Sequence, residues 1–282
     1  MDNLSLNPST KRQLDIYLKE PSHALLLVGP SGMGKLTLAA KLAEQLLDVK
    51  DFYSYPQALV IKRQEDKKLI SIDAVRELDN FLSLKVIGTK AINRVVIIQD
   101  AHELSLDAQN GLLKQLEEPP KGSVIILTTN SEQNLLPTVR SRLQRITIKK
   151  PSEADLRTAF KDLSEADFNK FYAISAGLPG LMSALAGNSD HPLVEATSLA
   201  RKILSSNTYE RLILVDKLSK DKELVVNCLT IMQQMAEISL ASSSEATSKR
   251  WNNVLKASYQ TSQSLNRNGQ TKLALTNLMI SL

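Results

Sequence analysis

The first 150 residues alternate between short, almost continuous apolar runs and stretches with helical periodicity. Apolar runs of this length are typical of strands buried on both faces, as in parallel sheets. The runs occupy residues 23–29, 58–62, 94–100, 123–130 and 145–150, and the helical stretches occupy 35–48, 72–84 and 105–118. This alternation predicts an α/β fold with a five-stranded parallel sheet flanked by helices.

Beyond Pro151 the pattern contains helices only. Ser152 and Asp155 have the spacing of a capping box, which marks the start of a helix. We predict helices at 152–161, 164–176, 180–187, 192–206, 208–219, 221–240, 246–265 and 269–281. The polar stretch 241–249 is predicted to link two of them. Apolar side chains on these helices predict bundled packing, and they include Leu212, Val215, Leu224, Leu229 and Met232.

Composition narrows the class of protein. Of the 282 residues 43% are hydrophobic, and the net charge of +5 permits contact with nucleic acid without requiring it. The single cysteine, Cys228, excludes an internal disulfide and a cysteine-based zinc site, and we expect it in a core. No apolar run approaches the roughly 18 residues of a membrane span, and no signal-peptide core is present. We therefore expect a soluble, cytoplasmic protein without membrane contact.

A phosphate-binding loop follows the first apolar run. The sequence from Gly29 to Lys35 matches G-x-x-x-x-G-K and opens a helical pattern. In such a loop the backbone amides and the helix N-terminus bind phosphate, and the lysine lies against the β- and γ-phosphates. The predicted nucleotide-binding residues are Gly29, Pro30, Ser31, Gly32, Met33, Gly34 and Lys35.

Two positions that would hold Mg²⁺ are altered. The motif should end in Ser or Thr, whose hydroxyl binds the metal, but Leu36 follows the lysine. Thr37 comes one residue late, about 100° around the helix, and should point away. A P-loop ATPase of this type ends its third strand in Asp-Glu, where this chain has Gln99 and Asp100. Asp100 either serves as a residual base or caps a turn, and the loss of both metal positions argues against Mg²⁺ binding and hydrolysis.

Three further motifs carry a family resemblance. "SIDAVREL" (71–78), "NGLLKQLEEPP" (110–120) and "SRL" (141–143), in this order around the acidic strand, resemble the clamp-loader family of AAA+ ATPases. The resemblance implies an AAA+ P-loop core at 1–150, a small helical lid at 151–190 and an all-α oligomerisation collar at 191–282. It also implies a role in loading a sliding clamp onto primed DNA.

The resemblance assigns roles to individual residues. Arg142 matches the arginine finger that reaches in trans into a neighbouring subunit's ATP site. Asn130 falls at the sensor position beside the γ-phosphate, or else simply ends a strand. Arg76 lies on a helix that contacts the DNA backbone in relatives, although it could equally be a solvated surface residue. Residues 178–180 contain no arginine, whereas motor subunits of the family carry a γ-phosphate sensor there.

Three functions remain after these observations. The favoured one is a loader subunit that binds ATP or ADP without Mg²⁺ or zinc, does not hydrolyse nucleotide, and donates Arg142. Its partners would be motor subunits, a clamp-opening subunit, the sliding clamp and the backbone of primed DNA. The first alternative is an ATP-hydrolysing motor subunit of the gamma/tau or replication factor C type. The second is another AAA+ DNA-processing ATPase or a P-loop kinase, for which no acceptor site is evident.

Overall fold

The computed structural model describes residues 5–64, 67–84, 90–187, 192–242, 245–266 and 269–282. They divide into two compact units, Met1–Ala159 and Phe160–Leu282. The boundary falls inside the segment 151–190 that the resemblance assigns to a single lid. Each unit is described by itself below.

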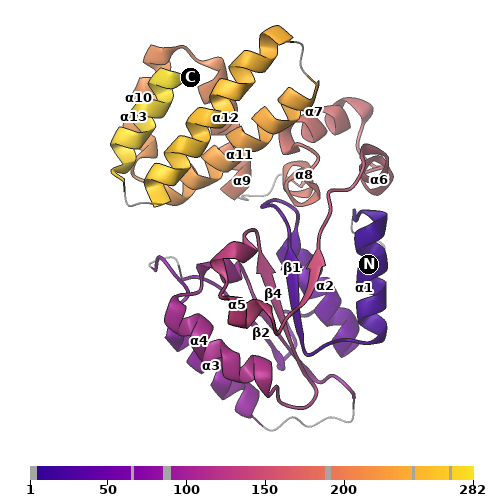
Figure 1. Ribbon diagram of the computed structural model, residues 1–282. Helices are drawn as coiled ribbons and strands as arrows, with labels where there is room; N and C mark the ends of the chain where they lie inside the picture. The colour runs from indigo at the N-terminus through magenta and orange to yellow at the C-terminus, as the bar shows by residue number, and fades with distance from the viewer. Residues whose placement is uncertain (1–4, 65–66, 85–89, 188–191, 243–244, 267–268) are drawn as a thin grey trace. The chain divides into compact units, whose positions relative to one another are not determined.

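The first unit is built on a five-stranded parallel sheet in the order β2-β3-β4-β1-β5. Each predicted apolar run overlaps one strand (Figure 1), with β5 beginning one residue before its run, so the predicted fold class is confirmed. The strands are β1 (Ala24–Val28), β2 (Ala58–Ile61), β3 (Arg94–Ile98), β4 (Ser123–Thr129) and β5 (Gln144–Thr147). Leu26 in β1 pairs with Leu127 on one side and with Arg145 on the other. Strand β1 therefore carries the phosphate loop between two neighbours in the interior of the sheet.

Helices cover both faces of this sheet. Helices α3 (Ile72–Ser83) and α4 (Leu106–Glu117) lie together on one face, and α1 (Pro8–Lys19) and α2 (Lys35–Leu47) lie on the other (Figure 1). The core under α3 and α4 joins alternate strand residues to helix residues and includes Leu26, Val96, Leu127, Leu78 and Leu112. Burial on two faces explains why the strands read as continuous apolar runs rather than as an alternating pattern.

Helix α1 was not predicted from the sequence. It begins after Asn7, whose side-chain oxygen accepts a hydrogen bond from the Ser9 amide at 3.0 Å. Only Thr10, Leu14 and Tyr17 are buried on it, so its apolar stripe is narrow. The Thr10 hydroxyl accepts a hydrogen bond from the Lys149 amide at 3.0 Å, which ties α1 to the chain that follows β5.

The capping box after Pro151 is confirmed. The Ser152 amide donates to Asp155 Oδ2 at 2.9 Å, and the Asp155 amide donates to Ser152 Oγ at 3.2 Å. Helix α6 (Glu153–Ala159) begins there and closes the first unit. The second unit contains α7 (Glu165–Ser175), α8 (Pro179–Ala186), α9 (Pro192–Ser205), α10 (Thr208–Leu218), α11 (Lys222–Ser242), α12 (Glu245–Asn266) and α13 (Thr271–Ser281).

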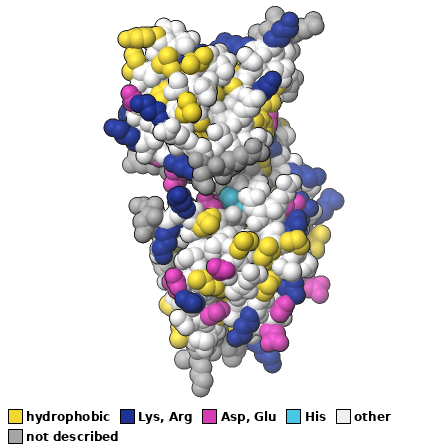
Figure 2. Space-filling view, turned by 60° about the vertical axis from the view of Figure 1, so that its left-hand side comes forward, with side chains coloured by type: hydrophobic (Ala, Val, Ile, Leu, Met, Phe, Trp, Pro, Cys, Tyr) yellow, Lys and Arg dark blue, Asp and Glu magenta, His cyan; other side chains and the backbone are white. Residues whose placement is uncertain are grey.

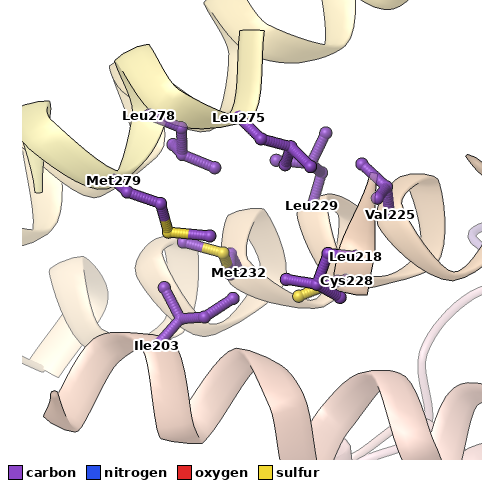
Figure 3. A pocket seen from close by; sticks show the side chains of 9 residues that line it. All are labelled: Ile203, Leu218, Val225, Cys228, Leu229, Met232, Leu275, Leu278 and Met279. Carbon is purple, nitrogen blue, oxygen red and sulfur yellow. The ribbon is translucent and has the colours of Figure 1, made fainter. Parts of the chain in front are cut away.

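The core of the second unit lies between α9, α10, α11 and α13. Figure 3 shows side chains from these helices around a cavity of about 10 Å³, among them Met232, Leu275 and Met279. The cavity is at the lower limit for one water and its lining is apolar apart from a thiol, so we interpret it as a packing gap. Cys228 is buried here, as predicted. Leu212 was predicted in the apolar face but is exposed, because the buried side of α10 is formed by Arg211, Val215 and Leu218.

The predicted link at 241–249 was wrong in extent. Helix α11 continues to Ser242 and α12 already begins at Glu245, while residues 243–244 lie outside the described part. The stretch contains no Gly or Pro. Ala, Ser, Glu and Lys are compatible with a helix, so polarity alone did not end either helix there.

Candidate nucleotide-binding site

The backbone of the loop between β1 and α2 takes its shape from two glycines. Gly32 and Gly34 adopt left-handed conformations, with φ of 81° and 74°. Gly34 precedes the first residue of α2, and no side chain caps the helix at this end. The amides of the first helical turn therefore face the loop without a side-chain acceptor, which suits an anionic ligand.

Lys35 is held inside the loop. Its Nζ donates to the carbonyl oxygen of Pro30 at 3.0 Å, and the residue is buried. Burial lowers the pKa of the Lys35 ammonium below its ordinary value, and the nearby Asp100 carboxylate partly opposes this shift. An anion in the loop would offer the ammonium a stronger partner than the Pro30 carbonyl.

Gln99 and Asp100 follow β3 and contact each other. Gln99 Nε2 donates to Asp100 Oδ2 at 3.2 Å. Asp100 is the only carboxylate of the two residues, and one of its oxygens already accepts this hydrogen bond. The Asp100 amide donates to Thr128 Oγ1 at 3.0 Å, and Asp100 has a positive φ of 49°. These contacts hold Asp100 in a turn that leads into the short helix η1 (Ala101–Glu103). Asp100 therefore also shapes the backbone at the end of β3.

Asn130, at the end of β4, contacts the phosphate loop directly. Its Nδ2 donates to Ser31 Oγ at 3.2 Å. One residue earlier, the Thr129 carbonyl accepts a hydrogen bond from the Gly29 amide at 3.1 Å. Since β3, β4 and β1 are adjacent in the parallel sheet, their carboxyl ends bring Asn130, Asp100 and Lys35 to one edge.

His102 is a site residue for which the sequence suggested no role. Its Nδ1 lies 3.4 Å from Thr129 Oγ1. Burial lowers the pKa of His102, the Asp100 carboxylate raises it, and the Lys35 ammonium lowers it again. Because Thr129 also accepts the hydrogen bond from the Gly29 amide, its contact with His102 places the imidazole beside the loop. Its position just after the acidic strand was the only sequence signal that could have indicated this.

The residues present fit a nucleotide phosphate better than a phosphate with Mg²⁺. Leu36 is half-buried and offers no oxygen, and Thr37 is exposed to solvent. Gln99 supplies an uncharged amide where a carboxylate is usual. Mg²⁺ prefers carboxylates together with phosphate oxygens and water. Among the described residues, no group of three or more His, Cys, Asp or Glu side chains could hold a metal ion.

Arg142 lies outside this cluster. It follows α5 (Pro137–Arg140), and its Nη1 donates to the Thr138 carbonyl at 2.7 Å. Its Nη2 lies 2.5 Å from Glu117 Oε1, at the end of α4. The buried Gln109 joins the same elements, because its Oε1 accepts from the Leu136 amide at 2.7 Å. Helix α4 therefore fixes the segment that carries Arg142.

Arg76 and residues 178–180 lie elsewhere. Arg76 is exposed on α3, where its Nη1 lies 2.7 Å from Asp73 Oδ1. Leu178 and Pro179 are buried at the start of α8. Leu143 packs against the core of the first unit. In the described part of the chain no helix has the length and apolar character needed to cross a membrane.

The sheet order, the loop after β1 and the polar residues at the ends of β3 and β4 define a P-loop protein of the AAA+ type. A family model described as DNA polymerase III, delta subunit, matches residues 9–152, just over half of the 282 residues. The chain belongs to this family, the delta-prime subunits among the clamp-loader proteins.

Curated relatives agree with this family. The chain is 31% identical over 188 residues to the delta' subunit of Pseudomonas aeruginosa DNA polymerase III, covering 59% of this chain and 56% of the relative. It is 30% identical over 184 residues to the Escherichia coli delta' subunit, covering 58% and 54%. A gamma subunit of Buchnera aphidicola is 32% identical over 161 residues, covering 53% and 44%. The chain thus matches about half the length of these relatives.

The same fold occurs in a solved structure. A DNA polymerase III gamma subunit-related protein from Thermotoga maritima superimposes with a TM-score of 0.53 at 19% sequence identity. The match covers 96% of this chain and 97% of that chain. At this identity the likeness supports the fold alone.

Proposed function

We propose that this chain is a subunit of a clamp loader, the ring that places a sliding clamp on primed DNA, and that it does not itself hydrolyse ATP. In this proposal the phosphate loop binds ATP or ADP to stabilise the subunit. Arg142 is donated to the ATP site of a neighbouring motor subunit, where it stabilises negative charge that develops on the γ-phosphate.

One observation carries the proposal. Leu36 and Gln99 stand at the two metal-related positions, while Arg142 is retained on a segment fixed by α4. Arg142 is about one-third exposed, and its guanidinium bonds to Glu117, Ser141 and the Thr138 carbonyl, all of which lie at the protein surface. Metal-assisted hydrolysis by this chain would need ligands that Leu36 and Gln99 do not supply. An arginine donated to a neighbouring subunit needs only to be exposed and to lie on a rigid segment.

Partner contacts would use exposed apolar side chains of the second unit. On the face of this unit seen in Figure 2, hydrophobic side chains lie exposed beside lysines and arginines. Tyr209 and Ile213 on α10 and Leu273 on α13 are more than half exposed, although large apolar residues are usually buried. We propose that they contact the other loader subunits, including the motor and clamp-opening subunits.

Contact with DNA would be weak and independent of sequence. Arg76 is exposed on α3, and its guanidinium can exchange Asp73 for a DNA phosphate, since an exposed ion pair is worth only about 0–1 kcal/mol. The subunit would work in the cytoplasm as a component of the DNA polymerase holoenzyme.

The test is reconstitution of the loader from its own subunits, with ATP turnover measured in the presence of clamp and primed DNA. Arg142→Ala should reduce turnover at the site that receives it, where arginine fingers contribute roughly 10³–10⁵-fold. Arg140→Ala, an exposed arginine two residues earlier, is the matched control and should leave turnover unchanged. Equal turnover of Arg142→Ala and the unmodified protein would remove Arg142 from the mechanism.

The alternative, an ATP-hydrolysing motor subunit, is favoured by Lys35, which is retained in the loop. It predicts Mg²⁺-dependent phosphate release by the isolated chain, abolished by Lys35→Ala. Turnover of that kind would replace the non-hydrolytic proposal, whereas its absence in both proteins supports it.

A further inference from the structure

The second unit contains a cavity of about 660 Å³ that none of the predicted site residues touches. Helices α7, α9, α11 and α12 contribute its walls, all within the same compact unit. Pockets of this size commonly hold small ligands or side chains of a partner. The residues that matter here are Arg201, Arg250, Trp251, Leu204, Met235 and Ala173.

The pocket has an excess of positive charge. Arg250 Nη2 donates to the Leu204 carbonyl at 2.7 Å, and Arg211 Nε donates to the Ile203 carbonyl at 2.8 Å. Both carbonyls lie in the last turn of α9, where a helix attracts cations. The two guanidiniums therefore bind the carbonyls of consecutive residues, and burial together with the Arg250 guanidinium lowers the pKa of Arg211.

Most guanidinium donors of Arg250 remain available. The bond to the Leu204 carbonyl occupies one of its five N–H groups, whereas Arg211 is buried and does not line the pocket. Arg201 is exposed, and within the described residues it makes no hydrogen bond or ion pair. No Asp or Glu occurs among the described residues that line the pocket. The lining of the pocket therefore leaves both arginines open to an anionic ligand.

The remaining wall is apolar and favours a peptide over a nucleic acid. Leu204 and Met235 offer aliphatic contact, and methionine adapts readily to different side chains. The Arg250 guanidinium carbon lies 5.9 Å from the centroid of the Trp251 ring, so a cation occupies one face of the indole. Single-stranded nucleic acids usually need free aromatic faces on which successive bases stack.

We propose that this pocket binds an acidic peptide segment of a partner protein. A carboxylate of the segment pairs with Arg201 and Arg250, and an adjacent large apolar side chain packs against Leu204 and Met235. Arginine binds carboxylates through paired, charge-assisted hydrogen bonds, which makes it the natural receptor for such a segment. The proposal does not depend on nucleotide binding or on Arg142.

Trp251 is the only tryptophan of the chain, so its fluorescence reports on the pocket. The probe is a peptide Asp-Leu-Asp-Phe-Asp-Leu, blocked at both ends, titrated into the full chain at low salt. We expect a saturable change in Trp251 emission. The same peptide with Asn in place of each Asp should bind at least about tenfold more weakly, because each lost charged hydrogen bond weakens binding.

Substitutions locate the site. Arg201→Gln should weaken binding of the Asp peptide about tenfold, whereas Lys202→Gln, the same change at the next position of α9, should have no effect. Ala173→Glu places a carboxylate at the pocket wall and should block binding of the Asp peptide. The helix content and the unfolding midpoint of this variant should stay unchanged, which shows that it still folds. The proposal is overturned by any of three results. These are no saturable change, equal affinity for the Asn peptide, or displacement of the Asp peptide by an oligothymidylate.

Discussion

The guanidinium of Arg142 and the carboxylate of Glu117 form an ion pair with Nη2 and Oε1 2.5 Å apart. Glu117 is the last residue of α4 and belongs to the "LEEPP" stretch, whereas Arg142 lies 25 positions further along the chain. Two of the motifs that carry the family resemblance therefore meet in one contact. The pair neutralises the arginine that we propose acts on a neighbouring ATP site.

Glu117→Gln should release Arg142 from this pair. An exposed ion pair contributes about 0–1 kcal/mol, so the subunit should keep its thermal stability within a degree or two. The freed arginine should raise the ATP turnover of the reconstituted loader at limiting subunit concentration, by up to about fivefold.

The matched control for this prediction is Glu118→Gln, one residue later, where the carboxylate makes no ion pair with Arg142. It should leave turnover at the unmodified value. A decrease in turnover on Glu117→Gln would mean that the carboxylate orients Arg142 rather than restraining it.

Restoring the two metal positions should not create an efficient ATPase. Leu36→Thr together with Gln99→Asp returns a hydroxyl and a carboxylate to the site, but residues 178–180 still supply no arginine. We expect phosphate release by the isolated double variant to stay close to background with and without Mg²⁺. Robust Mg²⁺-dependent turnover would show that the missing arginine matters less than the two metal ligands.

Nucleotide binding should depend on Lys35 and not on Mg²⁺. ADP at about a hundredfold excess over its Kd would add roughly 2.7 kcal/mol to the stability, or several degrees in the unfolding midpoint. Lys35→Met should abolish this shift, while Lys41→Met, on the exposed side of α2, should retain it. The shift should be the same with Mg²⁺ or with a chelator, and a large gain with Mg²⁺ would contradict our interpretation of Leu36 and Gln99.

Cys228 should be unreactive in the folded protein. Burial raises the pKa of its thiol from 9.0 to about 12, so almost no thiolate forms near neutral pH. A thiol reagent should label the chain only as fast as it unfolds, and denaturant should make labelling immediate. Rapid labelling of the native protein would show that the core around Met232 opens.

The same shift has a consequence for stability. Above pH 9 the unfolded chain loses the Cys228 proton while the folded chain keeps it, so this group's contribution to stability falls as the pH rises from about 9 to about 12. The slope is at most about 1.4 kcal/mol per pH unit. The Cys228→Ala variant should lack this pH-dependent loss of stability. Denaturant titrations of both proteins between pH 9 and pH 12 would measure the difference.

The sheet could be predicted from the sequence because each strand is buried on both faces. Ile97 and Leu127, for example, are fully buried and have apolar neighbours on both sides, which gives a continuous apolar run. Helix α1 was not predicted because few of its residues are buried. Only three of its residues are buried and Ile16 on its outer side is 60% exposed, so no clear stripe appears.

The sequence by itself determined the order of elements and the phosphate loop, including the loss of the hydroxyl at Leu36, because these depend on local pattern and spacing. Tertiary structure alone decided which side chains meet. Asn130 reaches Ser31 across 99 positions, His102 contacts Thr129 across 27, and Glu117 pairs with Arg142 across 25. Such contacts arise from the order of strands in the sheet and the packing of α4, and no local pattern encodes the distance between residues that are far apart in the chain.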